Sequence, residues 1–233
     1  MSTSSLLSPD EKWIWTLGGA LTPISKLGSG SYGEVFLCRF QGQPFALKRG
    51  RSAQEVRMWR KGKGESSDKE RMPCDARNGM DVAKEYAVLS VVGQHPHVVR
   101  AFAVLTSSNG RPGLLMEAGA ENLFSYSGRL KMCQDVPWFE SRKSVLALFR
   151  QTLFGLSYVH SRSILHLDMK HKNILVFPNG DNPRAALADF GLSAELDDKH
   201  CVKALGYQVY TVDFRCSEAL YADRDQATLN PKP

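Results

Sequence analysis

A β-hairpin with polar residues at its mouth constrains the fold of this chain more than any other feature. Ile174 to Phe177 is an apolar run of strand length, and the segment Pro178 to Pro183 contains Asn-Gly, the strongest short signal for a hairpin turn. The returning strand is Ala185 to Ala188. Because a hairpin brings its two ends together, we expect Asn173 and Asp189 to lie side by side, roughly 5 Å apart in backbone terms.

The residues at this mouth offer a specific set of chemical groups. Two side-chain oxygens in one place suit magnesium, which takes few protein ligands and keeps water and phosphate oxygens. In the preceding loop, the carboxylate of Asp168 can orient a hydroxyl and Lys170 can neutralise a phosphate. A polar turn beside a hairpin is the simpler explanation for any one of these residues. It does not explain the ordered set His166-Leu167-Asp168-Met169-Lys170, Asn173 and Asp189-Phe190-Gly191.

This set resembles the catalytic loop and magnesium loop of eukaryotic-type protein kinases, H-R-D-x-x-x-x-N followed by D-F-G. The resemblance implies that Asp168 accepts or orients the proton of a substrate hydroxyl, and that Asn173 and Asp189 hold Mg²⁺. Lysine two residues after the aspartate is typical of serine/threonine kinases, so Lys170 is expected to touch the transferred phosphate.

A glycine-rich segment near the N-terminus supports the resemblance. Leu27-Gly28-Ser29-Gly30-Ser31-Tyr32-Gly33-Glu34-Val35 contains G-x-G-x-x-G. Strand-like residues follow over 34–40, with a turn at 41–44 and a second strand at 45–48, so the glycines lie in a hairpin and do not open a helix. This arrangement resembles the kinase loop that covers the phosphates of ATP, where glycines let backbone N–H groups approach. A flexible surface turn is the alternative.

The second of these strands carries a lysine that needs a partner. Ala46-Leu47-Lys48 resembles the V-A-I-K strand of kinases, which implies that Ala46 and Lys48 belong to an ATP site. A helical stripe of apolar residues over 80–92 contains Glu85, and a carboxylate on a core-facing stripe is costly unless it is paired. We therefore predict a Lys48–Glu85 ion pair. A partly exposed glutamate at the edge of the stripe is the alternative.

A short buried strand ending in Met116 and Glu117 resembles the strand before the hinge between kinase lobes. The resemblance implies that Met116 lies beside the adenine, and that Glu117 to Gly119 offer backbone groups to it. Asn122 is the expected ribose contact.

Composition excludes several other classes of protein. The chain has 233 residues and no apolar run of about 18, so no membrane span is expected. The five cysteines have no C-x-x-C spacing, which predicts reduced thiols, no zinc site and a cytoplasmic or nuclear location. The net charge of +6 comes partly from an expected insert at about 49–78. Acids are interspersed there and aromatic residues are nearly absent, so nucleic-acid binding is not expected.

The predicted fold is an α+β, bilobal, protein-kinase-like fold. A leader at 1–17 precedes a small antiparallel β lobe with one main helix at 18–117, and a hinge at 118–122 leads to an incomplete, mostly helical lobe at 123–233. Residues 145–159 have the apolar pattern of a buried helix, while 127–140 are expected to form an irregular connection. Trp13 and Trp15 are expected to pack on the small lobe rather than to bind a ligand.

The chain departs from the kinase pattern in two places. Leu167 replaces the arginine that usually binds a phosphorylated activation loop, so activity is not expected to need that phosphate. Tyr210 to Glu218 resembles the end of the activation segment and implies that Thr211 contacts Asp168 and Lys170. Only residues 219–233 follow, which suggests a C-terminally truncated or minimal catalytic domain.

These features imply a serine/threonine protein kinase that transfers the γ-phosphoryl group of ATP to hydroxyls of a protein substrate, with Mg²⁺. The missing helices motivate the alternative, a non-catalytic kinase-like scaffold that binds ATP or an inactive kinase fragment. They also motivate a partner that covers the exposed face of the second lobe.

Overall fold

The computed structural model describes most of the two regions that carry the predicted motifs. The described residues are 12–15, 19–29, 33–50, 77–132, 138–180, 182–196, 202–203 and 228–229. The chain forms two compact units, of which the first comprises Met1–Ala87 and Arg100–Ala118 and the second comprises Val88–Val99 and Gly119–Pro233. The first unit is built on a β-sheet and the second on helices with short strands, which makes the fold α+β.

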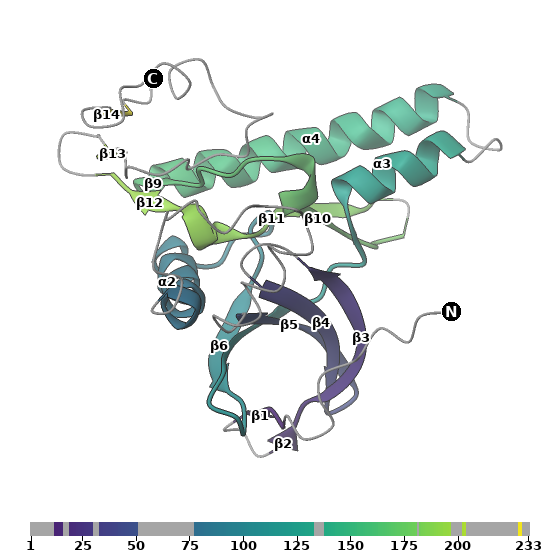
Figure 1. Cartoon of the computed structure of the whole chain (residues 1–233). Helices are drawn as coiled ribbons and strands as arrows, with labels where there is room; N and C mark the ends of the chain where they lie inside the picture. Colours follow the sequence, from purple (N-terminus) through teal and green to yellow (C-terminus); the bar gives the residue numbers. More distant parts are fainter. Residues whose placement is uncertain are drawn as a thin grey trace, which may run out of the picture. The chain divides into compact units, whose positions relative to one another are not determined.

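A five-stranded antiparallel sheet with the order β3-β4-β5-β7-β6 forms the first unit. It curves strongly (Figure 1). Its strands are β3 (Thr22–Ser29), β4 (Gly33–Phe40), β5 (Gln43–Gly50), β6 (Ala101–Thr106) and β7 (Pro112–Glu117). The β4–β5 turn consists of Gln41 and Gly42, which have φ of 47° and 80°. Positive φ at both central residues is the geometry that matches the twist of a two-residue hairpin.

Large apolar side chains fill one face of this sheet. Phe36, Leu47 and Leu115 are buried there together with Trp13. The short strands β1 (Ile14–Trp15) and β2 (Gly19–Ala20) form a hairpin of their own. The ring of Trp15 lies 5.0 Å from that of Phe40. The prediction that the two tryptophans pack on the small lobe is therefore confirmed.

The helix α2 (Arg77–Val92) buries one stripe, which includes Val82, Glu85 and Leu89. It ends at Gly93, whose φ is 78° and whose N–H donates to the carbonyl of Leu89 at 3.0 Å. This is the usual glycine stop of a helix. Between β5 and α2, residues 51–76 lie outside the described part, and most of the predicted insert and leader do so as well.

The second unit contains α3 (Leu123–Met132) and α4 (Trp138–Ser161). The expectation of an irregular connection over 127–140 is wrong for 127–132, which belong to α3, and for 138–140, which belong to α4; residues 133–137 lie outside the described part. Asn122 explains part of the error: its Oδ1 accepts a hydrogen bond from the N–H of Ser125 at 3.0 Å. This cap offsets the low helix propensity of the serines and glycine in α3.

The predicted burial of α4 is only partly correct. Leu148, Thr152 and Val159 are buried, whereas Phe149 is 53% and Leu153 is 48% exposed. With 3.6 residues per turn, the buried stripe passes through positions 148, 152, 155 and 159, and its neighbours at 149 and 153 point about 100° away. Both large side chains belong to the apolar pattern over 145–159.

Short strands complete the second unit. One sheet contains β8 (Glu121–Asn122), β10 (Ile174–Phe177) and β11 (Arg184–Leu187), and the pair β10–β11 confirms the predicted hairpin. The remaining elements are β9 (Ile164–Leu165), η1 (His171–Asn173), η2 (Phe190–Leu192), β12 (Ala194–Glu195), β13 (Val202–Lys203) and β14 (Thr228–Leu229).

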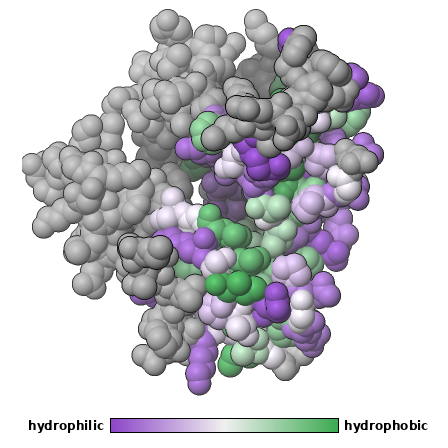
Figure 2. Space-filling model, turned by 90° about the vertical axis from the view of Figure 1, so that its right-hand side faces the viewer, coloured by the Kyte–Doolittle hydropathy of each residue, from purple (hydrophilic) through white to green (hydrophobic). Residues whose placement is uncertain are grey.

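On the face shown in Figure 2, hydrophilic residues surround smaller groups of hydrophobic ones. Within the described residues, no helix is both long and apolar enough to cross a bilayer.

Candidate active site

The strands that flank the glycine-rich segment form an antiparallel hairpin. β3 ends at Ser29 and β4 begins at Gly33, and the two strands are paired between Gly28 and Val35. Gly28 has open space where a β-carbon would stand, whereas a β-carbon on Gly33 would collide with the carbonyl oxygen of Arg49. The third glycine therefore lets β4 approach β5 closely. Gly30, Ser31 and Tyr32, which were predicted to cover phosphate, lie outside the described residues.

Strand register places four predicted nucleotide contacts on one face of the sheet. Val35 pairs with Lys48, and Ala46 pairs with Met116. Directly paired residues share a face, and so do residues two apart on one strand. Val35, Ala46, Lys48 and Met116 are thus on the face opposite Phe36 and the apolar core. Leu27 of β3 is exposed.

The ion pair predicted between Lys48 and Glu85 is present. Lys48 Nζ lies 2.6 Å from Glu85 Oε2, and Glu85 is 1% exposed. Leaving one partner of such a pair buried alone typically costs about 3–5 kcal/mol, so the two charges depend on each other. The pair fixes the ammonium group of Lys48, which lies two residues before the end of β5, on the face described above.

The predicted hinge residues each have a structural contact. Glu117 Oε1 accepts from the N–H of Arg100 at 2.9 Å, and the Glu117 N–H donates to the Arg100 carbonyl at 2.9 Å. A β-carbon on Gly119 would lie 3.0 Å from the Cβ of Leu175, so the backbone packs closely there. Oδ1 of Asn122, the expected ribose contact, caps α3.

In the second unit, His166 braces the catalytic loop from inside. Its ring is 1% exposed, and Nδ1 accepts a hydrogen bond from the Asp168 N–H at 3.3 Å. The proton is therefore on Nε2, which donates to the carbonyl of Ala188 at 3.0 Å. Burial lowers the pKa of His166, while the bond to Ala188 opposes this shift. A neutral imidazole thus ties the loop to the end of β11.

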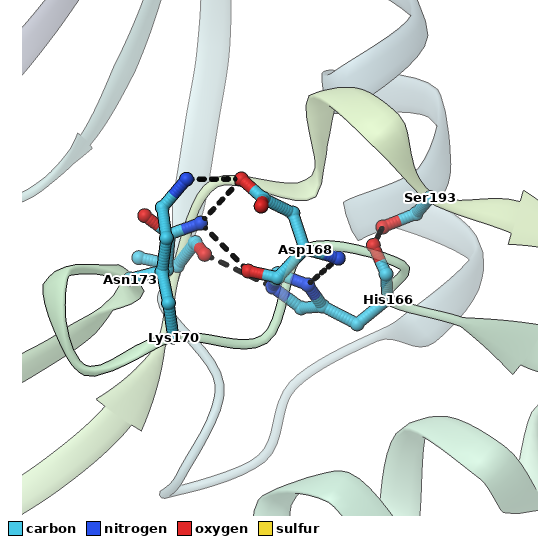
Figure 3. Close-up of polar contacts among 6 residues, drawn as sticks. His166, Asp168, Lys170, Asn173 and Ser193 are labelled. Atoms are coloured by element: carbon cyan, nitrogen blue, oxygen red, sulfur yellow. Dashed lines mark hydrogen bonds and ion pairs between the residues drawn. The ribbon is translucent and has the colours of Figure 1, made fainter. Parts of the chain in front are cut away.

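The carboxylate of Asp168 is held by two donors from its own loop (Figure 3). Lys170 Nζ lies 2.6 Å from Asp168 Oδ2, and Asn173 Nδ2 donates to the same oxygen at 2.9 Å. Asn173 Nδ2 also donates to the Asp168 carbonyl at 2.9 Å. Charge-assisted hydrogen bonds of this kind are stronger than neutral ones. They hold a nearly buried carboxylate in one orientation, beside a cation.

Asn173 and Asp189 are brought together as the hairpin predicts. Ile174 pairs with Leu187, and the Ala188 N–H donates to the Asn173 carbonyl at 2.8 Å. Asp189 has φ of 66°, an uncommon conformation for a residue other than glycine. Because Nδ2 of Asn173 is engaged with Asp168, its Oδ1 is the atom that can face a cation. Two hard oxygen donors at one mouth fit magnesium.

Leu167 has a packing role that the sequence did not reveal. Its φ is 61°, and its buried side chain forms an apolar cluster with Leu165, Ala194 and Leu196. The strand β12 pairs with β9, and Ser193 Oγ donates to the His166 carbonyl at 3.2 Å. Residues 193–196, which follow η2, are therefore held against the catalytic loop by hydrogen bonds and apolar contacts. Thr211, the other predicted contact of Asp168, lies outside the described residues.

Comparison with known proteins gives a consistent assignment. Residues 21–230 match the model of the protein kinase domain. A probable serine/threonine-protein kinase KIN1 homolog from Encephalitozoon cuniculi is 30% identical over 218 residues, which are 91% of this chain and 33% of that protein. CBL-interacting protein kinase 26 from Oryza sativa subsp. japonica is 28% identical over 75% of this chain and 30% of that protein.

A third relative, sucrose non-fermenting protein kinase 1 from Fusarium virguliforme, is 30% identical over 79% of this chain and 22% of its own length. The chain therefore spans about a third or less of the curated relatives that it matches. The family model, in contrast, covers nearly the whole chain, from the strand β3 to the pair β13–β14. The chain belongs to the protein kinase domain family.

Proposed function

We propose that this chain carries the catalytic site of an ATP- and Mg²⁺-dependent serine/threonine protein kinase. The observation that carries the proposal is the geometry around Asp168. Its buried carboxylate is oriented by Lys170 and Asn173, at the mouth of the hairpin that also bears Asp189. Family membership supports the reaction class, and the name of one relative, the serine/threonine-protein kinase KIN1 homolog, supports serine and threonine as acceptors.

In the proposed reaction, Asp168 accepts or orients the proton of the substrate hydroxyl. The hydroxyl oxygen bonds to the γ-phosphorus, the bond from that phosphorus to the bridging oxygen breaks, and ADP leaves. Lys170 places its ammonium group 2.6 Å from Asp168, where it can also contact the transferred phosphoryl group. Asn173 keeps the carboxylate from rotating away. Positioning and charge stabilisation supply most of the catalysis in this reaction class.

The proposed nucleotide and metal contacts are assigned residue by residue. Lys48, fixed by Glu85, is the proposed contact for the α- and β-phosphates, and the glycine-rich loop covers them. Asn173 and Asp189 would hold Mg²⁺. When bound, the ion neutralises the developing charge on phosphate oxygens. We assign the adenine side of the site to Ala46 and Met116, and the ribose contact to Asn122.

Three further features of the proposal concern partners and location. Thr211 completes the set expected for serine/threonine substrates. The half-exposed Phe149 and Leu153 on α4 are the side chains that a partner covering this face would bury. Cys38 is a buried free thiol whose pKa burial raises to about 11, as suits a cytoplasmic or nuclear protein with reduced cysteines.

The test is transfer of label from γ-labelled ATP to a generic basic protein substrate in the presence of Mg²⁺. We expect incorporation by the wild-type chain, and a loss of about a hundredfold or more in Asp168→Ala, since a positioned base contributes about 10²–10⁴ in rate. Asp189→Ala should lose activity and respond to higher Mg²⁺ concentrations. Glu195→Ala, a change of an exposed carboxylate on β12, is the matched control and should retain activity.

Two outcomes would contradict the proposal. Incorporation that persists in Asp168→Ala would assign the chemistry to another residue or to a contaminant. A wild-type chain that binds ATP without transferring phosphate would instead support the scaffold alternative.

A further inference from the structure

The residue directly after the third glycine of the loop connects three strands. Glu34 is the second residue of β4. Its Oε1 accepts a hydrogen bond from Lys26 Nζ of β3 at 2.5 Å, and its Oε2 accepts one from Arg49 Nη2 of β5. One carboxylate thus bridges to both neighbouring strands, one oxygen to each. We call Lys26, Glu34 and Arg49 the Glu34 clamp.

The clamp lies on the opposite face of the sheet from the proposed nucleotide contacts. Glu34 pairs with Arg49 in the ladder, while the next pair along is Val35 with Lys48. Because successive residues point to opposite faces, Glu34 and Arg49 share the face of Phe36 and the apolar core. The guanidinium of Arg49 lies 5.4 Å from the centre of the Phe36 ring. The clamp side chains therefore do not contact the proposed nucleotide site directly. They can affect it by fixing the position of the backbone.

The clamp lies next to both ends of the glycine-rich loop. Ser29 pairs with Glu34 and is the last residue of β3 before the loop. Gly33 closes the loop and packs against the carbonyl of Arg49 with no room for a β-carbon. Glu34 and Arg49 are largely buried, so solvent screens their attraction less than that of a surface pair. The Lys26 arm is more exposed.

From this geometry we propose that Glu34 is a positioning residue for the phosphate-covering loop. By joining β3 and β4 to β5, its carboxylate fixes the two ends of the loop relative to the strand that carries Lys48. The inference rests on the proposed function, since it assigns a role in the same ATP site. It predicts that losing the clamp weakens contacts to the phosphates of ATP and leaves contacts to adenosine unchanged.

The test compares Glu34→Gln, which keeps the shape of the side chain and removes its charge, with the wild type. We expect the KM for ATP to rise about tenfold with a smaller change in kcat, since small displacements of positioning groups cost up to about a hundredfold. Direct binding should weaken for ATP and ADP but not for adenosine. Lys26→Met, which removes one arm, should shift binding in the same direction by a smaller factor.

Controls separate positioning from general destabilisation. Lys84→Met removes an exposed lysine of α2 in the same unit, and Glu195→Gln repeats the carboxylate change elsewhere; both should bind all three ligands like the wild type. If Glu34→Gln melts too early for binding to be measured, Lys26→Met decides the question. Equal losses for ATP and adenosine, or no loss at all, would overturn the clamp proposal.

Failure of the proposed function gives a different result. A wild-type chain that binds ATP but transfers no phosphate would refute kinase activity and still allow the clamp to be tested by binding. A wild-type chain that binds no ATP would refute both.

Discussion

A substitution at Gly155 tests the close packing of α4 against the segment around His97. A β-carbon at this position would lie less than 3.0 Å from the carbonyl oxygen of His97 and 3.1 Å from its Cβ. The same carbonyl accepts a hydrogen bond from the N–H of Leu187 at 2.9 Å. The added methyl group of Gly155→Ala would therefore collide with the His97 carbonyl. That carbonyl holds Leu187, the last residue of β11, which lies two residues before Asp189.

Two effects of this substitution oppose each other. Alanine is favoured over glycine inside a helix by about 0.8–1.0 kcal/mol. Overpacking a close contact typically costs about 1–3 kcal/mol, and the obstacle here is backbone, which cannot rotate away, so the upper half of that range applies. The net loss is about 1–2 kcal/mol. In a chain of this size it corresponds to a melting temperature lower by about 2–8 °C.

The measurement is urea denaturation followed by circular dichroism, with Gly128→Ala as the matched control. Gly128 lies inside α3 and has no atom within 4 Å of the β-carbon site. Only the propensity gain should appear there, raising stability by up to about 1 kcal/mol. Faster hydrogen exchange at Leu187 in Gly155→Ala would locate the strain. If both alanine variants stabilise the protein equally, the close approach of α4 to His97 is wrong.

Two other predictions concern pH and phosphorylation. Burial lowers the pKa of His166 below its ordinary value of 6.5, and the pKa values of His95 and His160 shift the same way. The unfolded chain therefore binds more protons, so the contribution of these histidines to the free energy of unfolding is fully present above about pH 6.5 and falls as the pH drops below it. The melting temperature should be lower at pH 5.5 than at pH 7.5, and His166→Asn should reduce that difference. Because Leu167 cannot pair with phosphate, phosphatase treatment should leave kinase activity largely intact, and a complete loss of activity would count against this reasoning.

Local signals explain why much of the candidate site could be predicted from the sequence. Asn-Gly between two apolar runs predicts a hairpin, and the hairpin alone brings Asn173 and Asp189 together. The Lys48–Glu85 pair also follows from a simple argument, because a carboxylate on a buried stripe needs a cation. The first argument uses only chain geometry, whereas the second combines the cost of burying charge with the resemblance of Ala46-Leu47-Lys48 to the kinase strand, which points to Lys48 as the partner.

The arrangement of α4 could not be predicted in the same way. Its sequence has apolar residues on more than one face, so periodicity alone does not select the buried stripe. The choice is made by a small residue, Gly155, which lets the helix approach the segment that follows α2. The contact depends on residues more than 50 positions away in the sequence. The error over α3 has a local cause, the cap from Asn122.

The packing of Leu167 also could not be predicted from the sequence. The absence of an arginine at this position indicates that it cannot bind a phosphate, but it does not predict the apolar cluster with Ala194 and Leu196. Those two residues carry no motif. The backbone pairing of β9 with β12, extended by the hydrogen bond from the Leu196 N–H to the Ser163 carbonyl, brings them to Leu167.

The edge of β11 has a consequence for the order in which the protein assembles. Leu187 exchanges backbone hydrogen bonds with the segment 97–99, since the Val99 N–H donates to the Leu187 carbonyl at 2.8 Å and the Leu187 N–H donates to the His97 carbonyl at 2.9 Å. The hairpin can form by itself within microseconds, but this outer seam must wait for the chain to close a loop of nearly ninety residues. We therefore expect the strand that leads to Asp189 to reach its final position late in folding, after the local elements on either side have formed.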